Sequence, residues 1–410
     1  MNTLYLAGSA FNLYRRGTVS VSPAAASNYG AVYLSDNNPS TPHVAGSVAA
    51  DSYMRVQYNA LTNPGFQTST LSGWTDNDAG IGASTESAAG GRAGTKGLQL
   101  AGSSPGNNAS RYQDITVNAG EFRKASFWLQ GNSGGATQTG SLFIRNLRTG
   151  NYYNGSAWTA SRTAAVSATQ TNASFVQASV TYQVESFDTC RADTVSLRWE
   201  LYSEEIVIVD DCLDLPGVSF ASIHGHNYGD VISPLVQSSD DGSAWTTRAT
   251  MTIKRPAFFS SFSIIYAEYW QIKLSGTNFE APYTGEAVLG QAVTSAARPL
   301  WSPVVSREFP GYRQSGSAGV ATAYNTATDP TESIGMDFLA TTATAEKDLY
   351  DNLWLRSRQG ESPVIIVPRD DEPGVYLGHL MDPYKHSRPF GDARPTDLFL
   401  KGAPFPTIGL

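Results

Sequence analysis

The sequence predicts a mainly β protein that contains more than one β-sandwich. Short stretches of alternating apolar and polar residues recur along the chain, separated by turns rich in Gly, Asn, Ser and Asp. Charged residues make up only 16% of the 410 residues and aromatic residues 11%, and there are 38 glycines. This balance favours strands and tight turns, because aromatic and β-branched side chains fit a pleated, half-buried surface. The length allows two or three domains.

The alternation predicts strands, with one helical exception. It is clearest in Tyr53–Gln57, Gly97–Leu100, Ala125–Leu129, Ser141–Leu147, Phe175–Val184, Val195–Leu201 and Ile206–Val209. Ala345–Arg358 instead places apolar or small residues near a helical period, and Gly360 follows as a stop signal. The strand-like PVIIVP comes directly after it, at 363–368. The last third of the chain is therefore predicted to be α+β.

Composition and charge argue against several kinds of partner. The net charge of −8 disfavours binding to nucleic acid or to an anionic membrane surface. No stretch approaches 18 apolar residues, so we expect no membrane insertion. The first residues, MNTLYLAGSAFNLYRRG, lack the pattern of a secretory signal. Cys190 and Cys212 are the only two cysteines; one disulfide and two separate buried thiols are both compatible with the sequence.

The order of the predicted elements indicates that one domain is inserted in another. From Leu61 to about Asp211 the chain reads as a complete β-sandwich that begins with LTNPGFQTSTLSGW and ends with EIVIVDD. The segments on either side, 38–59 and 213–227, each read as a fragment of something else. A domain whose ends lie close together can be inserted in a surface loop without disrupting its host. An insertion is therefore the simplest interpretation.

The inserted segment resembles a known kind of binding domain. The stretches LTNPGFQTSTLSGWT, GTKGLQL, RYQDITVNAGEFRKASFWLQ and EIVIVDD are similar to galactose-binding-like β-sandwiches of the carbohydrate-binding-module type. Gln67 stands where that family usually has Glu. Some members hold a structural calcium near the opening and closing strands, which here implies Asp210, Asp211 and Gln67 as ligands. Calcium prefers six to eight oxygens, several of them charged, and Gln67 offers only a neutral one.

The flanking segments resemble a second galactose-binding-like fold, of the discoidin kind. The resemblance is carried by GVSFASIHGHNYGDVISPLVQSSDDGSAWT and by the later YAEYWQIKLSG. The Asp-Gly of SSDDGSAWT predicts a tight hairpin turn. The resemblance implies two jelly-roll sandwiches: a split discoidin-like one over 1–58 and 213–285, and a carbohydrate-binding-like one over 59–212.

The remaining residues, 286–410, are expected to form a small α+β module. The ordered series YWQIKLSG, GEAVLGQAV, IGMDFLATTATAEKDLYDNLWL and SPVIIVPRDDEPGVYLGHL resembles a C-terminal module of minor tail proteins of tailed bacteriophages. That resemblance implies a distal-tail-like protein of a siphophage-like tail tip or baseplate. Its partners would be other tail proteins and copies of itself in a symmetric ring.

The candidate binding residues are aromatic. In NYYNGSAWTAS, Asn154-Gly155 predicts a hairpin turn that places Trp158, Tyr152 and Tyr153 near a loop tip. Sugar rings stack their C–H faces on such side chains, so these three are predicted to bind glycan. Packing of Trp158 on its own hairpin is an equally good reading of the same pattern.

No catalytic arrangement is evident in the sequence. His224 and His226 have a spacing that a metal site could use, but no Cys or carboxylate pair lies near them. The pairs Glu204-Glu205 and Asp210-Asp211 are adjacent, and neighbours on a strand point to opposite faces. The chain contains no nucleophile elbow or P-loop. We therefore expect no enzymatic activity and no required cofactor.

These features together predict a virion protein of the tail tip, made in the cytoplasm of a bacterial host. Its inserted sandwich would meet glycan on the host cell surface, where several copies on one particle raise the effective concentration. Two alternatives remain open. One is a secreted glycan-active enzyme with accessory carbohydrate-binding domains, and the other is a tail decoration that binds no sugar.

Overall fold

The three-dimensional structure is a computed structural model of the whole chain. The residues that it describes are 4–8, 11–26, 30–35, 43–45, 51–67, 71–87, 91–92, 96–131, 136–228, 232–254, 257–276, 282–295, 298–299, 304–308, 311–315, 321–325, 331–340, 357, 364–367, 376–380, 385–386 and 394–402. The statements below concern these residues.

The chain divides into two compact units. The inserted unit is Asn59–Gly217, and the split unit combines Met1–Tyr58 with Val218–Leu410. The sequence analysis placed the inserted sandwich at 59–212, and the structure extends its last strand to Pro216. The predicted C-terminal module, 286–410, is part of the split unit. Each unit is described below by itself.

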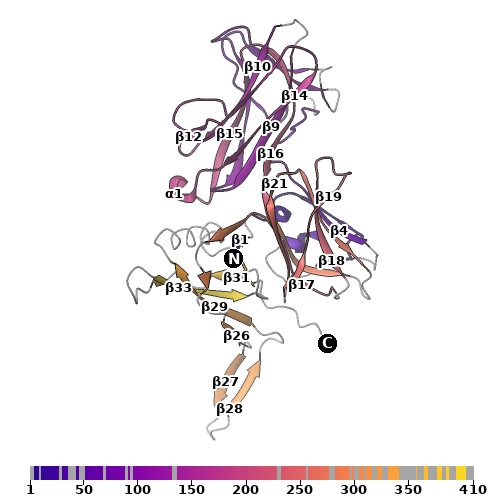
Figure 1. Cartoon of the computed structure of the whole chain (residues 1–410), viewed down its shortest axis with the longest axis vertical. Helices are drawn as coiled ribbons and strands as arrows, with labels where there is room; N and C mark the ends of the chain where they lie inside the picture. Colours follow the sequence, from indigo (N-terminus) through magenta and orange to yellow (C-terminus); the bar gives the residue numbers. More distant parts are fainter. Residues whose placement is uncertain are drawn as a thin grey trace. The chain divides into compact units, whose positions relative to one another are not determined.

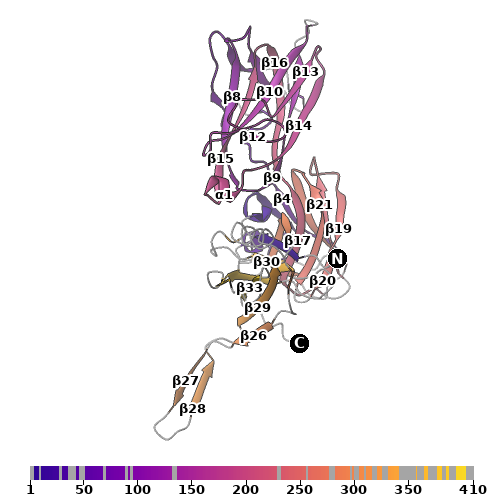
Figure 2. The ribbon, with the colours of Figure 1, turned by 60° about the vertical axis from the view of Figure 1, so that its left-hand side comes forward.

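The inserted unit contains two antiparallel sheets, and most of their longer strands are labelled in Figures 1 and 2. The first, here called the β10/β15 sheet, has the order β12-β11-β10-β15-β8-β5, with β13 paired to β10. Its strands are β5 (Thr75–Asp76), β8 (Ala109–Asn118), β10 (Gln138–Asn146), β11 (Tyr152–Tyr153), β12 (Trp158–Thr159), β13 (Val166–Gln170) and β15 (Thr194–Ser203).

The second sheet of the inserted unit, the β9/β16 sheet, has the order β14-β9-β16-β7-β6. Its strands are β6 (Ala83–Ser87), β7 (Gly97–Ala101), β9 (Phe122–Gly131), β14 (Phe175–Gln183) and β16 (Ile206–Pro216). A short helix, α1 (Phe187–Cys190), connects β14 to β15. Each of the seven clearly alternating stretches lies on a strand, and the predicted mainly β fold class is confirmed.

The core of the inserted unit lies between its two sheets. Alternate residues of β15 point into it and are at most 3% exposed, namely Val195, Leu197, Trp199 and Leu201. The ring of Trp74, from the opening motif, meets that of Trp199 edge-on at 5.8 Å between centroids. Burial of each such side chain contributes about 1.5–3 kcal/mol. The motif LTNPGFQTSTLSGW therefore supplies part of the sandwich core.

The two ends of the inserted unit are tied together. The side chain of Asn59 donates to the carbonyl of Cys212 (3.1 Å) and accepts from the backbone N–H of Asp214 (3.1 Å). The N–H of Ala60 donates to the carbonyl of Asp214 at 3.1 Å. The chain thus leaves the inserted unit beside the point where it begins, as an insertion requires.

A buried ion network lies at the same end of the inserted unit. The Nε of Arg123 is 2.6 Å from Oδ1 of Asp214, and its Nη1 is 2.6 Å from Oε2 of Glu121. Tyr182 donates its hydroxyl to Asp214 Oδ2 at 2.7 Å. The four residues are at most 2% exposed. Burial raises the pKa of the Asp214 carboxyl, and the guanidinium opposes that shift.

The split unit also contains a sandwich. The β18/β22 sheet has the order β19-β18-β22-β4-β2, formed by β2 (Thr18–Ser22), β4 (Asp51–Gln57), β18 (Ser233–Ser239), β19 (Thr246–Thr250) and β22 (Tyr269–Ser275). The β17/β21 sheet has the order β20-β21-β17-β23-β3, formed by β3 (His43–Val44), β17 (Val218–His226), β20 (Thr252–Lys254), β21 (Ala257–Ile265) and β23 (Tyr283–Gly290).

The core of this sandwich draws on both halves of the split chain. Met54 and Val56 on β4 join Val236 and Trp270 in one buried cluster. The 3-10 helices η2 (Leu13–Arg15) and η3 (Ala31–Ser35) contribute further residues. Asn12 precedes η2 and bridges to β23: it donates to Ala287 O at 2.8 Å and accepts from Leu289 N at 3.1 Å. Residues before and after the insertion thus build one domain.

A third sheet of the split unit, the β29/β33 sheet, combines the beginning and the end of the chain. Its order is β24-β1-β30-β31-β33-β29-β25, with β26 paired to β29 and β32 to β33. The strands are β1 (Leu4–Gly8), β24 (Ala292–Ser295), β25 (Arg298–Pro299), β26 (Val304–Glu308), β29 (Thr331–Ala340), β30 (Val364–Val367), β31 (Tyr376–Leu380), β32 (Lys385–His386) and β33 (Arg394–Gly402). Strands β27 (Gly311–Ser315) and β28 (Ala321–Asn325) pair with each other.

This sheet changes one detail of the sequence-based division. Strand β1 pairs with β24 and β30, so the first residues belong to the C-terminal sheet and not to the sandwich that holds β2 and β4. The strand predicted at PVIIVP is β30. The helix predicted at 345–358 lies outside the described residues, except for Ser357.

Two further expectations have an outcome in the structure. Cys190 and Cys212 are both buried free thiols, so the reading as two separate thiols is the one that the structure supports. Among the described residues, no helix combines the length and the apolar character needed to cross a membrane.

Candidate functional site

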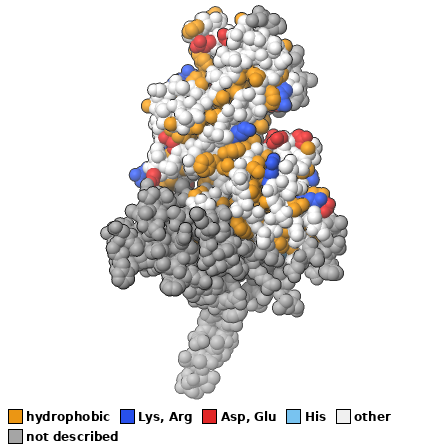
Figure 3. Space-filling view, viewed as in Figure 1, with side chains coloured by type: hydrophobic (Ala, Val, Ile, Leu, Met, Phe, Trp, Pro, Cys, Tyr) orange, Lys and Arg blue, Asp and Glu red, His pale blue; other side chains and the backbone are white. Residues whose placement is uncertain are grey.

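Charge is dispersed over the visible surface of the described residues. In the space-filling view, blue and red side chains are scattered between apolar and neutral ones (Figure 3). Long-range attraction of a charged partner is therefore weak on this face. A binding site is better sought where aromatic and polar side chains gather.

Such a gathering lies on the outward face of the β10/β15 sheet. The inward residues of β15 alternate with Arg198, Glu200 and Tyr202, which therefore point away from the core. The neighbouring strands β8, β10 and β11 add aromatic and charged side chains that also point away from the core. Arg162, from a loop, lies over two of the aromatic rings. We call this set the platform; it consists of Tyr112, Asp114, Phe143, Arg145, Tyr152, Arg162, Arg198, Glu200 and Tyr202.

The strand register brings the platform residues together in rows. Arg198 on β15 is opposite Asp114 on β8 and opposite Arg145 on β10. Arg145 is in turn opposite Tyr152 on β11, and its Cζ lies 5.3 Å from the centroid of that ring. Facing residues on adjacent strands are about 4.5–5.5 Å apart. The next row, formed in the same way, is Tyr112, Glu200 and Phe143.

An arginine fixes one aromatic ring of the platform. Arg198 makes a two-pronged ion pair with Asp114, at 2.9 Å from Nε to Oδ1 and 3.0 Å from Nη2 to Oδ2. Its Cζ lies 3.7 Å from the ring centroid of Tyr112. The hydrogen bonds to Asp114 raise the pKa of Arg198, so the guanidinium stays charged. The Tyr112 ring therefore lies against a guanidinium that Asp114 holds in place.

A second arginine covers the neighbouring aromatic pair. The rings of Phe143 and Tyr202 meet edge-on at 5.6 Å. Arg162 crosses them, with its Cζ 4.1 Å from the Phe143 centroid and 5.0 Å from the Tyr202 centroid. Tyr202 donates its hydroxyl to Glu204 Oε1 at 2.6 Å, and burial raises the pKa of this phenol to about 12. The phenol is neutral at physiological pH.

Glu200 is the carboxylate at the centre of the platform. It is only 5% exposed, and its Oε1 accepts from Asn77 Nδ2 (2.9 Å) and Arg162 Nη2 (3.3 Å). Within the described residues, Oε2 has no hydrogen-bond partner, so it remains able to accept from a ligand. The fixed orientation lowers the entropic cost of binding a hydroxyl there.

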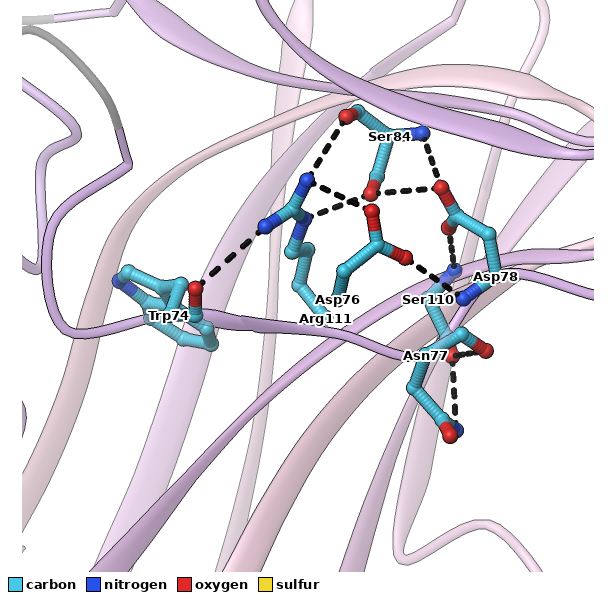
Figure 4. A network of polar contacts seen from close by, with 7 residues as sticks. All are labelled: Trp74, Asp76, Asn77, Asp78, Ser84, Ser110 and Arg111. Atoms are coloured by element: carbon cyan, nitrogen blue, oxygen red, sulfur yellow. Dashed lines mark hydrogen bonds and ion pairs between the residues drawn. The ribbon is translucent and has the colours of Figure 1, made fainter.

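Asn77 is positioned by a polar network at the edge of the sheet (Figure 4). Ser110 donates its hydroxyl to Asn77 O at 2.9 Å and its backbone N–H to Asp78 Oδ1 at 2.8 Å. Asp78 Oδ2 accepts both the N–H (2.7 Å) and the hydroxyl (2.9 Å) of Ser84. Arg111 reaches the same Ser84 hydroxyl at 2.6 Å. These bonds hold the loop at 76–78, and through Asn77 they hold Glu200.

The platform has the chemistry of a saccharide site. The ring of Tyr112 offers an apolar surface for C–H groups, while Glu200 and the arginines offer acceptors and donors for hydroxyls. Sites of this kind fix a ligand by a few polar groups placed among aromatic side chains. No second carboxylate joins Glu200 in its row, since Tyr112 and Phe143 flank it there.

The structure separates the three aromatic residues predicted from the sequence. The predicted turn is present, with Gly155 at a φ of 92° and Asn154 N donating to Ala157 O at 3.0 Å. Tyr153 and Trp158 are opposite each other and pack toward the core; Tyr153 is 7% exposed. Tyr152 is on the other side of the strand and belongs to the platform. Of the three, it is the one that faces outward with the arginines.

Trp158 is engaged within the inserted unit. Its indole N–H donates to Gln183 O at 2.8 Å, and its ring lies 5.5 Å from that of Tyr153 and 6.4 Å from that of Tyr182. The contact with Tyr153 is the packing on its own hairpin that the sequence left open as the alternative, and the contacts with Gln183 and Tyr182 add β14 to it. Glycan binding through Trp158 stays a prediction.

The residues predicted as calcium ligands do converge. A Cβ added to Gly65 would lie 3.3 Å from Asp211 Oδ1, 3.7 Å from Asp210 Oδ1 and 3.7 Å from Gln67 Cγ. The place is a bulge of β16, where the register shifts after Asp210 and Asp211 has a φ of 45°. Opening and closing strands therefore meet here, as the resemblance implies.

An arginine occupies the position of a cation in this cluster. Arg92 donates its backbone N–H to Asp210 Oδ2 and its Nη1 to Asp211 Oδ2, both at 2.6 Å, and its Cζ lies 3.9 Å from the centroid of the Trp128 ring. Gln67 turns its amide N–H toward Lys96 O. Calcium prefers several charged oxygens, and the described residues hold no group of three or more His, Cys, Asp or Glu suited to a metal. The described donors form an arginine–carboxylate cluster, and calcium binding by Asp210, Asp211 and Gln67 stays a prediction.

The two histidines considered for metal binding are packed in the split unit. His224 is fully buried, with Nε2 3.0 Å from Ser222 Oγ, and burial lowers its pKa to about 3. His226 stacks on Tyr228 at 4.9 Å between centroids, and burial lowers its pKa to about 4. Both are neutral packing residues at physiological pH.

Comparison with known proteins gives likeness in shape alone. No family model matches the chain, and no curated protein matches it in sequence. Among solved structures, it is similar to the carbohydrate-binding and catalytic modules of a Clostridium thermocellum xylanase in complex with xylohexaose. That match has 17% identity and a TM-score of 0.29, and covers 38% of this chain and 28% of that one.

Two other solved structures show a comparable likeness. A xylan-binding domain from Paenibacillus barcinonensis is 18% identical with a TM-score of 0.28, covering 37% of this chain and 90% of that one. The enzymatically active domain of tailspike protein 4 of bacteriophage CBA120 is 12% identical with a TM-score of 0.27, covering 38% of this chain and 21% of that one. At such identities and scores, the functions of those proteins are not evidence for the function of this one.

Proposed function

We propose that the inserted unit is a glycan-binding domain and that the platform is its binding face. The observation that carries the proposal is the row Tyr112, Glu200 and Phe143, in which a central carboxylate is flanked by two aromatic side chains. Arg198 and Arg162 hold the rings, and Asn77 holds the carboxylate. A face organised in this way is ready for a sugar without rearrangement.

The proposed role is binding and not catalysis. Glycoside hydrolysis uses two carboxylates about 5–9.5 Å apart across the scissile bond. Of the two platform carboxylates, Asp114 is committed to Arg198 through both of its oxygens, while Glu200 keeps only Oε2 for a ligand. The platform therefore does not offer a pair of free carboxylates.

We further propose that the chain works as a structural protein of a phage-type tail tip or baseplate, located in the virion. Support for this comes from the resemblance of the C-terminal segments to tail proteins and from the way β1 joins the C-terminal sheet, which links both ends of the chain in one unit. In that setting the split unit would contact other tail proteins and copies of itself, and the inserted unit would reach the glycan.

The proposal is tested by binding to a panel of soluble polysaccharides that includes xylan and bacterial surface polysaccharides. Affinity electrophoresis would compare the full-length chain with its Tyr112→Ala and Glu200→Gln variants. Loss of one aromatic contact of about 0.5–1.5 kcal/mol predicts Kd values up to about tenfold higher for Tyr112→Ala. Glu200→Gln removes the charged acceptor and is expected to weaken binding at least as much.

The matched control is Phe122→Ala, which removes an aromatic side chain that is 41% exposed on β9, in the other sheet of the same unit. It should bind like the unaltered chain. Equal affinity of all four proteins, or no binding to any polysaccharide, would refute the platform as a glycan site. Particles labelled by an antibody against 59–217 would test the tail location separately.

A further inference from the structure

A second arginine site lies on the outward face of the β18/β22 sheet, in the split unit. The guanidinium of Arg55 on β4 is flanked by two rings: its Cζ lies 4.7 Å from the centroid of Tyr53 and 5.2 Å from that of Trp245. Tyr53 and Arg55 are two residues apart on one strand and so share a face. Trp245 comes from the turn just before β19. Two aromatic rings at these distances restrict the planar guanidinium.

A series of side-chain hydrogen bonds through two glutamines also fixes Arg55. Arg55 Nε donates to Gln271 Oε1 at 2.7 Å, and Gln271 Nε2 donates to Gln237 Oε1 at 2.5 Å. Gln237 then donates its Nε2 to Thr247 Oγ1 at 2.9 Å. The register places these residues side by side across four strands, and Gln271 is only 2% exposed. Arg55 is therefore oriented before any ligand binds.

The outer edge of this guanidinium is unused. Within the described part of the chain, the two terminal amino groups of Arg55 have no hydrogen-bond acceptor, and the side chain forms no ion pair. Lys273, a second basic residue on this face, is in contrast already paired, with its Nζ 3.0 Å from Asp51 Oδ2. Two parallel N–H donors in a fixed fork match the two oxygens of a carboxylate.

We propose that this face binds the carboxylate of an acidic sugar unit, a uronate, in a glycan chain. The Arg55 fork would hold the carboxylate, and the Trp245 ring beside it would receive the C–H face of the sugar. On the adjoining row, the amide of Gln57 donates to Tyr269 at 2.9 Å and to Glu268 Oε1 at 2.7 Å. Within the described residues the side-chain carbonyl oxygen of Gln57 has no donor, so it can accept from a sugar hydroxyl.

The position of Arg55 in the sheet favours a sugar over an acidic peptide. Strand β4 lies between β2 and β22, so its backbone groups are already paired on both sides. A peptide that adds as a strand needs an open sheet edge, and one that binds as a helix needs an apolar groove. The face around Arg55 carries amides, hydroxyls and two aromatic rings, beside the Lys273–Asp51 ion pair and the Glu268 carboxylate that accepts from Gln57. Amides and aromatic rings together are typical of saccharide sites.

The experiment is an isothermal titration of the full-length chain with short oligomers of galacturonate, glucuronate and mannuronate. Their methyl esters and an oligo-glutamate serve as comparison ligands. At least one uronate oligomer should bind, and its ester, which has lost the negative charge, should bind at least tenfold more weakly. Arg55→Gln should weaken uronate binding at least tenfold, and Arg55→Lys should give an intermediate loss because it keeps the charge but not the fork.

Two control variants show whether the loss of binding is specific to Arg55. Arg248→Gln removes another arginine of the same sheet, one that donates to Ser238 Oγ at 2.7 Å, and should leave uronate binding unchanged. Phe122→Ala, which removes an exposed aromatic side chain on β9 of the inserted unit, should also leave it unchanged. Thermal unfolding of each variant shows whether it is folded, and Arg55→Lys decides the question if Arg55→Gln is not.

Three results would overturn the proposal. They are equal binding of the ester and the acid, unaltered binding by the Arg55 variants, and no binding of any uronate oligomer at millimolar concentration. Binding of oligo-glutamate as tight as that of the uronates would replace the sugar by an acidic peptide as the partner. None of these results bears on the platform, because that face belongs to the other unit.

Discussion

Replacing Arg123 by methionine should lower the free energy of unfolding of the inserted unit by about 3–5 kcal/mol, the usual cost of removing one partner from a buried ion pair. In this network the guanidinium lies 2.6 Å from both Asp214 and Glu121. Methionine has a similar length but no charge, so it would leave two carboxylates facing each other away from water. Asp214 is 0% exposed and Glu121 1%, so little solvent would screen the two carboxylates from each other.

The magnitude can be measured by urea unfolding of the fragment 59–217, followed by tryptophan fluorescence. Small domains have total stabilities of about 5–15 kcal/mol and m-values of about 1–3 kcal/mol/M in urea. With an m-value of about 2 kcal/mol/M, the loss corresponds to a midpoint lowered by about 1.5–2.5 M. The same change should appear in the full-length chain as an earlier transition of the inserted unit.

The matched control is Arg198→Met in the same fragment. Arg198 also makes a two-pronged ion pair, but Arg198 and Asp114 are 28% and 40% exposed, and surface pairs contribute about 0–1 kcal/mol. A loss below about 1 kcal/mol for Arg123→Met, or a loss equal to that of Arg198→Met, would refute the view that this buried network stabilises the inserted unit.

Two further predictions concern protons and calcium. In the folded state the pKa values of His224 and His226 are about 3 and about 4, so between these values and pH 6.5 the unfolded chain binds more protons than the folded chain. As the pH is lowered through this range, the free energy of unfolding should fall by about 1.4 kcal/mol per pH unit for each histidine. The slope of denaturant-derived stability against pH should become shallower in His224→Gln, and a slope that is the same in both proteins between pH 6.5 and 4.5 would contradict the burial of this residue. Calcium should change the melting temperature of the unaltered chain by less than about 1 °C relative to a chelator, because the Arg92 guanidinium already pairs with Asp211 and its backbone N–H already donates to Asp210. Arg92→Gln should melt earlier and regain part of the loss with calcium. A calcium-dependent rise of several degrees in the unaltered chain would show that the arginine does not hold this position.

Much of the strand pattern could be predicted from local sequence. The alternation in 195–201 marks β15, because every second residue enters the core, and the same logic locates β4 and β16. The insertion could be predicted because the opening and closing strands of the inserted unit carry recognisable motifs. These features depend on residues that are close together in the chain.

The platform could not be read in the same way, because its residues come from separate strands. Tyr112, Phe143 and Glu200 lie side by side only through the register of β8, β10 and β15, which is set by pairing over tens of residues. One signal was present: if Trp199 faces the core, then Glu200 must face outward. That signal identifies the face but not the partners across it.

The remaining differences have the same origin. Trp158 follows a predicted turn, but the two-residue strands β11 and β12 pair so that its ring turns toward Tyr182 and away from the platform. Arg92 reaches Asp210 across 118 positions of sequence, and no local pattern announces such a contact. Non-local pairing and long side chains therefore decide the sites, while local alternation decides the strands.

The most direct test of the central claim is hydrogen–deuterium exchange of the full-length chain with and without the polysaccharide fragment that binds best. Bound glycan should slow exchange in the loops that border the platform, at 76–82 and 160–165, because their amides lie beside Asn77 and Arg162. The strands β9 and β14 of the other sheet should exchange as before. Protection confined to that other sheet, or to the tip at 154–157, would place the glycan elsewhere and contradict the platform as the binding face.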